Sequence, residues 1–238
     1  MIEKEKEGLK WLEFEQLQPF VEIKHGVFLR SPPFDDRTVL TPQKNAAEKL
    51  LGHPFLVLGK QVHKDHVAAI DVKPAQLLRV EMCDGCMTSK KEVGLLVRHA
   101  DCQAVIFYDP VCQVIANVHC GWRGSVQGIL PKTVRQMEKR YGCRPGNILV
   151  CISPSLGPNA AEFRNYQDEL PETFYPFQIR PTYFDFWEIS RFQLKQTGIL
   201  DGNIEIAKLC TYSDPSRFYS YRQHKQCGFH LTCVSLGM

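Results

Sequence analysis

The 238-residue chain lacks the segments that direct a protein to export or into a membrane. Its first residues, MIEKEKEGLKWLEFEQL, alternate charges and contain no apolar core of the kind that a secretory signal needs. No run approaches the ~18 consecutive apolar residues that mark a membrane helix. These absences predict a cytoplasmic protein with no membrane partner.

Basic clusters, internal repeats and low-complexity linkers are also missing. Apolar residues make up 44% of the chain and charged residues 23%, and the formal net charge of +3 comes from dispersed lysines and arginines. Nucleic-acid binding requires a concentrated basic surface, so we expect no nucleic-acid partner. The length suits one globular domain spanning residues 1–238, in which residues 1–20 form a polar N-terminal extension with a strand or short element that packs on the body. The sequence indicates no particular oligomeric state.

Cysteine, in contrast, is abundant, with ten residues. Without an export signal, reduced thiols are expected, and most should act as small buried apolar side chains, as the contexts of Cys112, Cys151, Cys210 and Cys233 suggest. Cys83 and Cys86 form a C-x-x-C pair. Because no second pair and no histidines at finger spacing accompany it, the pair is weak evidence for a structural zinc site.

Short apolar runs outnumber helical patterns. Runs at 93–98, 103–109 and 113–119 predict strands, and the short link between the last two predicts a hairpin. We expect further strands at 25–30, 55–62, 67–72, 147–153, 204–212 and 218–222, and helices at 41–51, 125–141, 160–170 and 186–197. Thr41 is the expected N-cap of its helix and Gly52 the expected stop, while Pro131 predicts a kink or a later start. The pattern favours an α+β fold with a mostly antiparallel or mixed sheet.

Three potential metal ligands lie at or just past the ends of predicted strands: His63, Cys102 and His119. If these strands share a sheet, the three side chains converge on a zinc set that leaves one position open for water, as catalytic sites do. The spacing alone favours three unrelated buried residues, because ligands far apart in sequence leave no local pattern. A third interpretation is a nucleophile–base pair of Cys102 and His119 in a thiol hydrolase, which requires Cys102 to be free of metal.

Polar residues near these three are further candidates. Arg123 lies in Gly121-Trp122-Arg123-Gly124, a tight turn before a predicted helix, and either forms an anion site or is a surface residue of that turn. Asp101 is either a carboxylate that orients an imidazole or a turn residue bonded to nearby backbone. Gln61 would face the same side of a strand as His63.

Several motifs together resemble one known family. They are QVH at 61–63, DG..T at 84–88, ADC at 100–102, H.GWRG at 119–124 and CTYSDPSRFYSYR at 210–222. The chain is similar, over residues 28–222, to the YfiH-type family, also called the multicopper polyphenol oxidoreductase or laccase-domain family, which includes peptidoglycan editing factor and purine nucleoside phosphorylase. The resemblance implies a single layered α+β domain and one zinc ion held by His63, Cys102 and His119.

The resemblance also implies phosphorolysis of purine nucleosides (adenosine, inosine, guanosine and methylthioadenosine) and deamination of adenosine. The partners would then be a nucleoside and phosphate. One His/Cys trio offers too few ligands for several copper centres, so zinc is favoured over copper and laccase activity is disfavoured. Asp101 and Arg123 are the predicted catalytic residues. Substrate would contact side chains that hold phosphate or stack on a base, namely Arg30, Gln61, Tyr219, Tyr221 and Arg222.

The sequence departs from the family motifs at four places. Arg30 is followed by SPPF instead of a glycine pair, His99 replaces a threonine, CGF at 227–229 replaces TGR, and Arg222 is followed by glutamine instead of a second arginine. The metal trio is intact, so these changes concern the substrate. A thiol hydrolase, a cell-wall-precursor editing factor and a non-enzymatic zinc-binding partner protein are the alternative functions.

Overall fold

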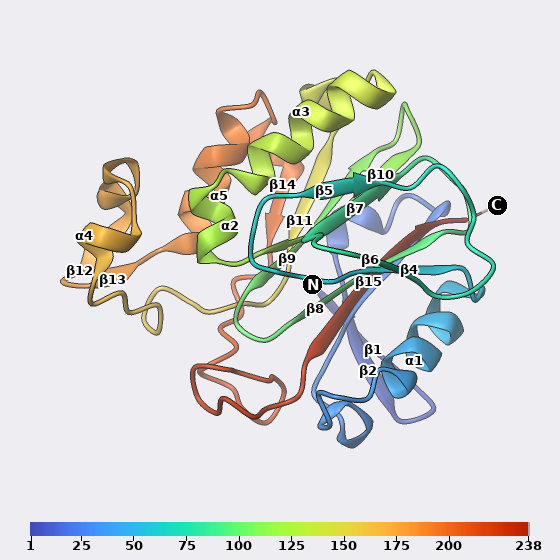
Figure 1. Cartoon of the computed structure of the whole chain (residues 1–238), viewed down its shortest axis with the longest axis horizontal. Helices are drawn as coiled ribbons and strands as arrows, with labels where there is room; N and C mark the ends of the chain where they lie inside the picture. The colour runs from blue at the N-terminus through green and yellow to red at the C-terminus, as the bar shows by residue number, and fades with distance from the viewer. Residues whose placement is uncertain (238) are drawn as a thin grey trace.

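The computed structural model describes residues 1–237, which build two facing β-sheets with helices on their outer sides (Figure 1). Both sheets contain parallel and antiparallel pairs. The expected α+β fold with mixed sheets is therefore confirmed.

The seven-stranded sheet contains, in spatial order, β1 (Ile2–Lys6), β2 (Leu9–Glu13), β3 (Ile23–Phe28), β15 (His230–Leu236), β8 (Gly94–His99), β4 (Leu56–Gly59) and β6 (Leu78–Val80). The six-stranded sheet contains β14 (Ile204–Ile206), β11 (Leu149–Ile152), β9 (Gln103–Asp109), β10 (Val114–Cys120), β7 (Gly85–Thr88) and β5 (Val67–Ala69). A separate hairpin joins β12 (Gln178–Arg180) to β13 (Tyr183–Phe184). The predicted hairpin of β9 and β10 is present.

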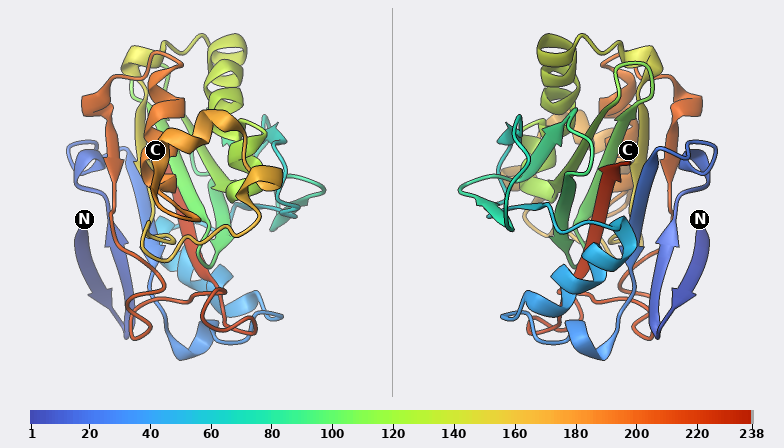
Figure 2. Two further views of the ribbon diagram at one scale, coloured as in Figure 1. Left: turned by 90° about the vertical axis from the view of Figure 1, so that its left-hand side faces the viewer. Right: turned by 90° about the vertical axis from the view of Figure 1, so that its right-hand side faces the viewer.

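The helices are α1 (Thr41–Leu51), α2 (Trp122–Val126), α3 (Ile129–Tyr141), α4 (Tyr166–Glu169) and α5 (Phe186–Lys195). Five short 3₁₀ turns are η1 (Glu15–Leu17), η2 (Pro32–Phe34), η3 (Pro145–Asn147), η4 (Glu172–Phe177) and η5 (Asp201–Asn203). Helix α1 lies beside the seven-stranded sheet, and α3 and α5 lie beside the other (Figures 1 and 2). No helix of residues 1–237 is long and apolar enough to cross a membrane.

Strand β9 is apolar on both faces because each face is covered. Ile106 and Tyr108 point into the core between the two sheets, whereas Val105 and Phe107 pack in the core that α3 closes. A strand buried on both sides reads as a continuous apolar run rather than an alternating one. The central strands are therefore rigid supports for the polar residues at their ends.

The predicted helix starts and stops are partly wrong. Gly52 ends α1 in the left-handed conformation, as expected, but Thr41 lies inside the first turn and the N-cap is Leu40, which has no side-chain cap bond. Leu40 is anchored by its own burial in the core, so the helix starts one residue earlier than the polar cap suggested. The predicted helix 125–141 is divided between α2 and α3 at Gly128, whose φ is +74°. Pro131 falls in the first turn of α3, where no backbone donor is needed.

Other predicted elements are shorter in the structure than expected, because long-range contacts override the local sequence pattern. The helix expected at 160–170 is only α4, since Phe163 is buried and its N–H donates to the carbonyl of Thr182. The strand expected at 218–222 is irregular chain at 218–220 and a turn at 221–222, and the one at 204–212 ends with β14. Residues 1–20 are more than an extension, because β1 and β2 form one edge of the seven-stranded sheet.

Candidate metal centre

The three predicted metal ligands meet where the chain passes between the two sheets. His63 follows β4 of the seven-stranded sheet, and His119 lies in β10 of the six-stranded sheet. Cys102 lies in the link from β8 to β9, which crosses from one sheet to the other. These strands do not share one sheet, so the convergence comes instead from this crossing.

The ligand atoms of the trio all lie within 4.8 Å of one another. The rings of His63 and His119 are nearly perpendicular, with centroids 4.8 Å apart, and burial increases from exposed His63 through half-buried Cys102 to buried His119. Gly121 leaves room beside them, because a Cβ at this position would lie 3.0 Å from Cys102 Sγ and 3.3 Å from His63 Cδ2. His63 itself has a φ of +59°, a strained conformation of the kind that is common at functional sites.

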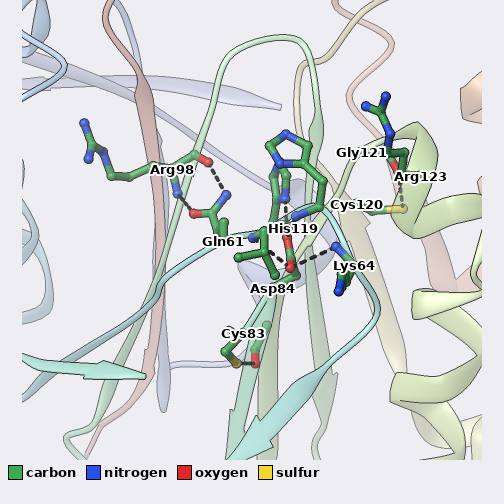
Figure 3. A network of polar contacts seen from close by, with 12 residues as sticks. Gln61, Lys64, Cys83, Asp84, Arg98, His119, Cys120, Gly121 and Arg123 are labelled. Atoms are coloured by element: carbon green, nitrogen blue, oxygen red, sulfur yellow. Dashed lines mark hydrogen bonds and ion pairs between the residues drawn. The ribbon is translucent and has the colours of Figure 1, made fainter. Parts of the chain in front are cut away.

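Asp84 is the residue that orients the trio, and sequence reasoning missed it. Its Oδ1 lies 3.0 Å from His119 Nδ1 and accepts the N–H of His63 at 2.8 Å, while Oδ2 accepts the N–H groups of Val62 and Lys64, both at 3.0 Å (Figure 3). Asp84 is 1% exposed. A carboxylate that holds Nδ1–H turns the opposite ring nitrogen toward the metal position. Asp84 was included in the DG..T motif, but no role was assigned to its carboxylate.

The electrostatics of the trio favour a thiolate. Burial alone would raise the pKa of the Cys102 thiol, but the imidazoles of His119 and His63 outweigh burial and lower this pKa to about 6. Burial alone would lower the pKa of His119, but Cys102 and Asp84 raise it to about 9. Two imidazoles and a thiolate are a donor set that suits zinc, and three protein ligands leave a position free. A second cluster of potential ligands, Asp109, Cys112 and Cys143, involves the opposite end of β9.

The trio lies between two cavities. The larger, about 870 Å³, is lined by many cationic side chains, and we call it the arginine chamber. Its cations are Arg37, Lys60, Arg79, Arg98 and Arg123. The smaller, about 290 Å³, is the aromatic chamber. Its aromatic side chains are Trp122, Phe163, Phe186 and Tyr221. His63, Cys102, Arg123 and Tyr221 line both chambers.

Five of the remaining predicted site residues lie at these cavities: Arg123, Gln61, Tyr221, Arg222 and Asp101. Tyr221 is exposed, and Arg222 lines the aromatic chamber while its guanidinium donates to the carbonyl of Glu162. Gln61 lines the arginine chamber, and its amide bonds both the N–H and the C=O of Arg98, so it continues the pairing of β4 with β8 (Figure 3). Gln61 therefore has a structural role beside any contact with substrate.

Asp101 lines the aromatic chamber but contacts neither histidine of the trio. Its Oδ1 accepts a hydrogen bond from the Thr211 hydroxyl at 2.7 Å, and its Oδ2 accepts one from the N–H of Arg222 at 2.6 Å. Asp101 therefore holds the loop that carries Arg222. The imidazole-orienting role expected of Asp101 is filled by Asp84.

Tyr219 and Arg30 line neither cavity. Tyr219 is 1% exposed, and its hydroxyl is bonded to Ser31 and Asp35, so its ring has no face free for a base. Arg30 lies over the Tyr219 ring and donates to the carbonyl of Pro215. Both predictions followed motif position, which does not reveal on which side of a loop a side chain lies.

Two facing mixed sheets with a His₂Cys trio at their crossing define an α+β protein with a candidate metal site. A family model described as "Multi-copper polyphenol oxidoreductase laccase" matches residues 34–237, and the chain belongs to this family.

The chain is also similar to individual proteins. It is 29% identical over 183 residues to "Purine nucleoside phosphorylase" of Bacteroides thetaiotaomicron, a match covering 71% of this chain and 68% of that protein. It is 28% identical over 228 residues to "Purine nucleoside phosphorylase PA4543" of Pseudomonas aeruginosa, covering 92% and 87%. The match to the Mus musculus protein "Purine nucleoside phosphorylase LACC1", at 30% identity and 74% of this chain, spans only 43% of that protein.

Among solved structures, the "hypothetical protein YfiH" of Bacillus licheniformis has a TM-score of 0.80 at 25% identity over 96% of each chain. The similarity therefore extends over both sheets and all of the elements that hold the trio.

Proposed function

We propose that this protein is a zinc-dependent purine nucleoside phosphorylase that also deaminates adenosine. The observation that carries the proposal is the position of the His63, Cys102 and His119 trio between an aromatic and a cationic cavity. A purine nucleoside offers an aromatic base, and phosphorolysis adds an anionic co-substrate. The names of the related proteins support the same reaction.

The aromatic chamber would bind the purine. Phe163 contacts Trp122 edge-on at 5.9 Å and lies at 33° to Phe186 at 5.0 Å, so the aromatic wall is pre-assembled. Stacking of a base on such a wall is worth ~1–3 kcal/mol per base. Tyr221, at the boundary of the two chambers, would contact the nucleoside close to the trio.

Arg123 would hold anionic oxygen beside the trio. It lines both chambers, and its guanidinium lies 4.3 Å from the centroid of the Trp122 ring, which orients its planar fork. An arginine fork matches phosphate geometry with paired hydrogen bonds. Asp101 would act indirectly, through the loop of Arg222.

His63, Cys102 and His119 would hold the zinc ion, with Asp84 keeping the proton on His119 Nδ1. When bound, zinc supplies Lewis acidity and lowers the pKa of a coordinated water, which is the chemistry that deamination of a purine ring requires. Within residues 1–237 the two-histidine, one-cysteine trio occurs once, which also supports zinc over a multicopper arrangement.

The decisive test incubates zinc-loaded protein with adenosine and phosphate and separates the products by chromatography. Adenine with ribose-1-phosphate would report phosphorolysis, and inosine would report deamination. Cys102→Ser should abolish both products, whereas Cys227→Ser, which removes a thiol outside the trio, should preserve both. Absence of every product from protein with a full complement of zinc would refute the proposal.

A thiol hydrolase remains a second candidate because the low pKa of Cys102 and the high pKa of His119 favour a thiolate–imidazolium pair. The two functions make opposite demands on Cys102. Alkylation of Cys102 that proceeds rapidly in zinc-saturated protein would favour the hydrolase, and protection by zinc would favour the phosphorylase.

A further inference from the structure

The arginine chamber carries much more positive charge than its acidic lining balances. Glu81 contributes the only Asp or Glu side chain of the lining in the described residues, and its Oε2 lies 3.0 Å from Lys60 Nζ. Within residues 1–237, none of the arginines of this chamber forms an ion pair with a carboxylate. Four arginines therefore line one cavity without a carboxylate partner in the described residues.

Two of these arginines are fixed in place by a shared aromatic ring. The guanidinium carbons of Arg98 and Arg37 lie 4.5 and 4.9 Å from the centroid of the Phe229 ring. Arg98 also donates to the carbonyl of Arg37, and Arg37 donates to the carbonyl of Lys225, both at 2.6 Å. These contacts pre-organise the pair, because the side chains have less freedom to lose when a ligand binds.

The protein itself does not satisfy this cluster. Arg98 Nε is buried and has no hydrogen-bond partner in the described chain, and the same holds for Nδ1 of His99, which lines the same chamber. Burial and the charges of Arg37 and Arg79 lower the pKa of Arg98 to about 10, so assembling these charges is costly. A ligand that brings negative charge would remove that cost.

We propose that the arginine chamber binds a phosphate group, through Arg98 and Arg37 on the Phe229 ring and Arg79 on β6. A phosphate carries nearly two negative charges at neutral pH and accepts several hydrogen bonds at once, which matches converging guanidinium forks better than one carboxylate does. Two sources share this chemistry, inorganic phosphate and the phosphate ester of a nucleotide. The first source rests on the proposed phosphorolysis, and the second does not.

Isothermal titration of the zinc-loaded full chain tests the proposal, with inorganic phosphate, adenosine and adenosine 5′-monophosphate as separate titrants. Arg98→Gln and Arg79→Gln should each weaken phosphate or nucleotide binding about tenfold, because each removes a charge-assisted hydrogen bond. Arg79 is exposed, so its variant avoids the risk that a change at half-buried Arg98 disturbs folding. Arg135→Gln on α3 removes the same charge outside the chamber and should change nothing.

The titrants identify the source. If the nucleotide binds more tightly than adenosine to wild-type protein, and this difference disappears in Arg98→Gln and Arg79→Gln, the bound group is the phosphate ester. Weakened binding of inorganic phosphate, with nucleotide and nucleoside equal in affinity, indicates the free anion. The proposal is wrong if wild-type protein binds no phosphate and does not prefer the nucleotide, or if both variants bind like Arg135→Gln.

These results are independent of turnover. If phosphate binding depends on Arg98 and Arg79 but the protein releases no purine from adenosine, the phosphate site is supported and the phosphorylase activity is refuted. If the protein releases purine from adenosine but anion binding is unchanged in both variants, the phosphorylase activity is supported and the phosphate site in the arginine chamber is refuted.

Discussion

The arginine and aromatic chambers share the metal trio but differ in how they are built. The aromatic chamber takes Phe163 and Phe186 from the segment that continues to α5, where Phe163 packs in an apolar core with Phe184 and Ile189, and takes Trp122 and Tyr221 from other elements. The arginine chamber is also assembled from separate elements, with Arg79 on β6, Arg98 on β8 and Phe229 beside β15. One chamber gathers aromatic rings that an apolar core supports, and the other concentrates charge that the protein leaves unpaired.

The aromatic chamber therefore offers a surface that accepts a flat ring, whereas the arginine chamber selects for negative charge. Apolar contact discriminates weakly between similar ligands, whereas buried donors without partners reject a ligand that cannot satisfy them. We therefore expect the arginine chamber to determine ligand selectivity. Two departures from the family motifs, His99 and Phe229, line that chamber, which agrees with this expectation.

The largest effect should come from the residues that both chambers share. His119→Ala removes a ligand from the trio and should reduce bound zinc from about one ion per chain to near zero, with loss of nucleoside turnover. Elemental analysis after dialysis measures the metal. His66→Ala, which removes an exposed histidine outside the trio, is the control. Full zinc content in His119→Ala would contradict the assigned site.

The next effect distinguishes two carboxylates. Asp84→Asn should weaken zinc binding ~10–100-fold, because the ligand His119 loses the group that orients its ring. Asp101→Asn is the matched control and should keep zinc affinity, since Asp101 binds Thr211 and Arg222 instead. Competition with a chromogenic chelator measures both. Equal weakening in the two variants would remove the distinction between these residues.

A smaller change should separate the chambers. Phe186→Leu keeps apolar volume in the aromatic chamber but removes a stacking face, so KM for adenosine should rise ~5-fold or more while KM for phosphate stays constant. Phe192→Leu, on the same helix but outside the cavity, is the control. Steady-state kinetics with each substrate varied in turn is the measurement. A parallel rise in both constants would show that the chambers do not act separately.

The effect that bears least on either chamber is one on folding stability, through the loop that carries Tyr221 to their boundary. His230 Nε2 accepts the N–H of Tyr219 at 2.7 Å, and burial lowers the pKa of His230 to about 4 from 6.5. The unfolded chain therefore takes up a proton at this residue between pH 6.5 and 4 while the folded chain does not. Stability should fall by about 3 kcal/mol from this group as the pH drops through that window.

Urea unfolding at neutral and acidic pH measures this loss. His230→Gln replaces the imidazole with a side chain that does not titrate, so the pH dependence of its free energy of unfolding should be shallower than that of wild-type protein. His66→Gln, at an exposed position, should retain the wild-type slope. Identical slopes in wild-type protein and His230→Gln would contradict the assignment.

The metal trio could be predicted from the sequence because apolar strands and motif residues coincide at its three positions. The assignment of the strands to two sheets could not be predicted, since His63 and His119 each lie near the end of an apolar run, although the two strands belong to different sheets. The role of Asp84 was missed because the DG..T motif does not show which groups its carboxylate contacts. A carboxylate with bonds to distant backbone leaves no pattern near itself.

The arginine chamber was also beyond sequence reasoning. Arg37, Arg79 and Arg98 lie far apart in the chain, and the dispersed basic residues were interpreted as an ordinary charged surface. Whether an arginine faces a cavity or solvent depends on the direction of its side chain. That direction is set by the packing of Phe229 and by loops, whose sequences show no hydrophobic periodicity. The predictions for Tyr219 and Arg30 had the same weakness.

Because the site lies where the chain crosses between the sheets, a bound metal ion would affect the stability of the fold. His119 lies in the six-stranded sheet and His63 in the loop that follows β4 of the seven-stranded sheet, so an ion bound to both would join the two, and unfolding would have to release it. Linkage then predicts a gain of about 2.7 kcal/mol when free zinc exceeds its Kd a hundredfold. The melting temperature of the protein, measured in buffers of increasing free zinc, would therefore report the occupancy of the site.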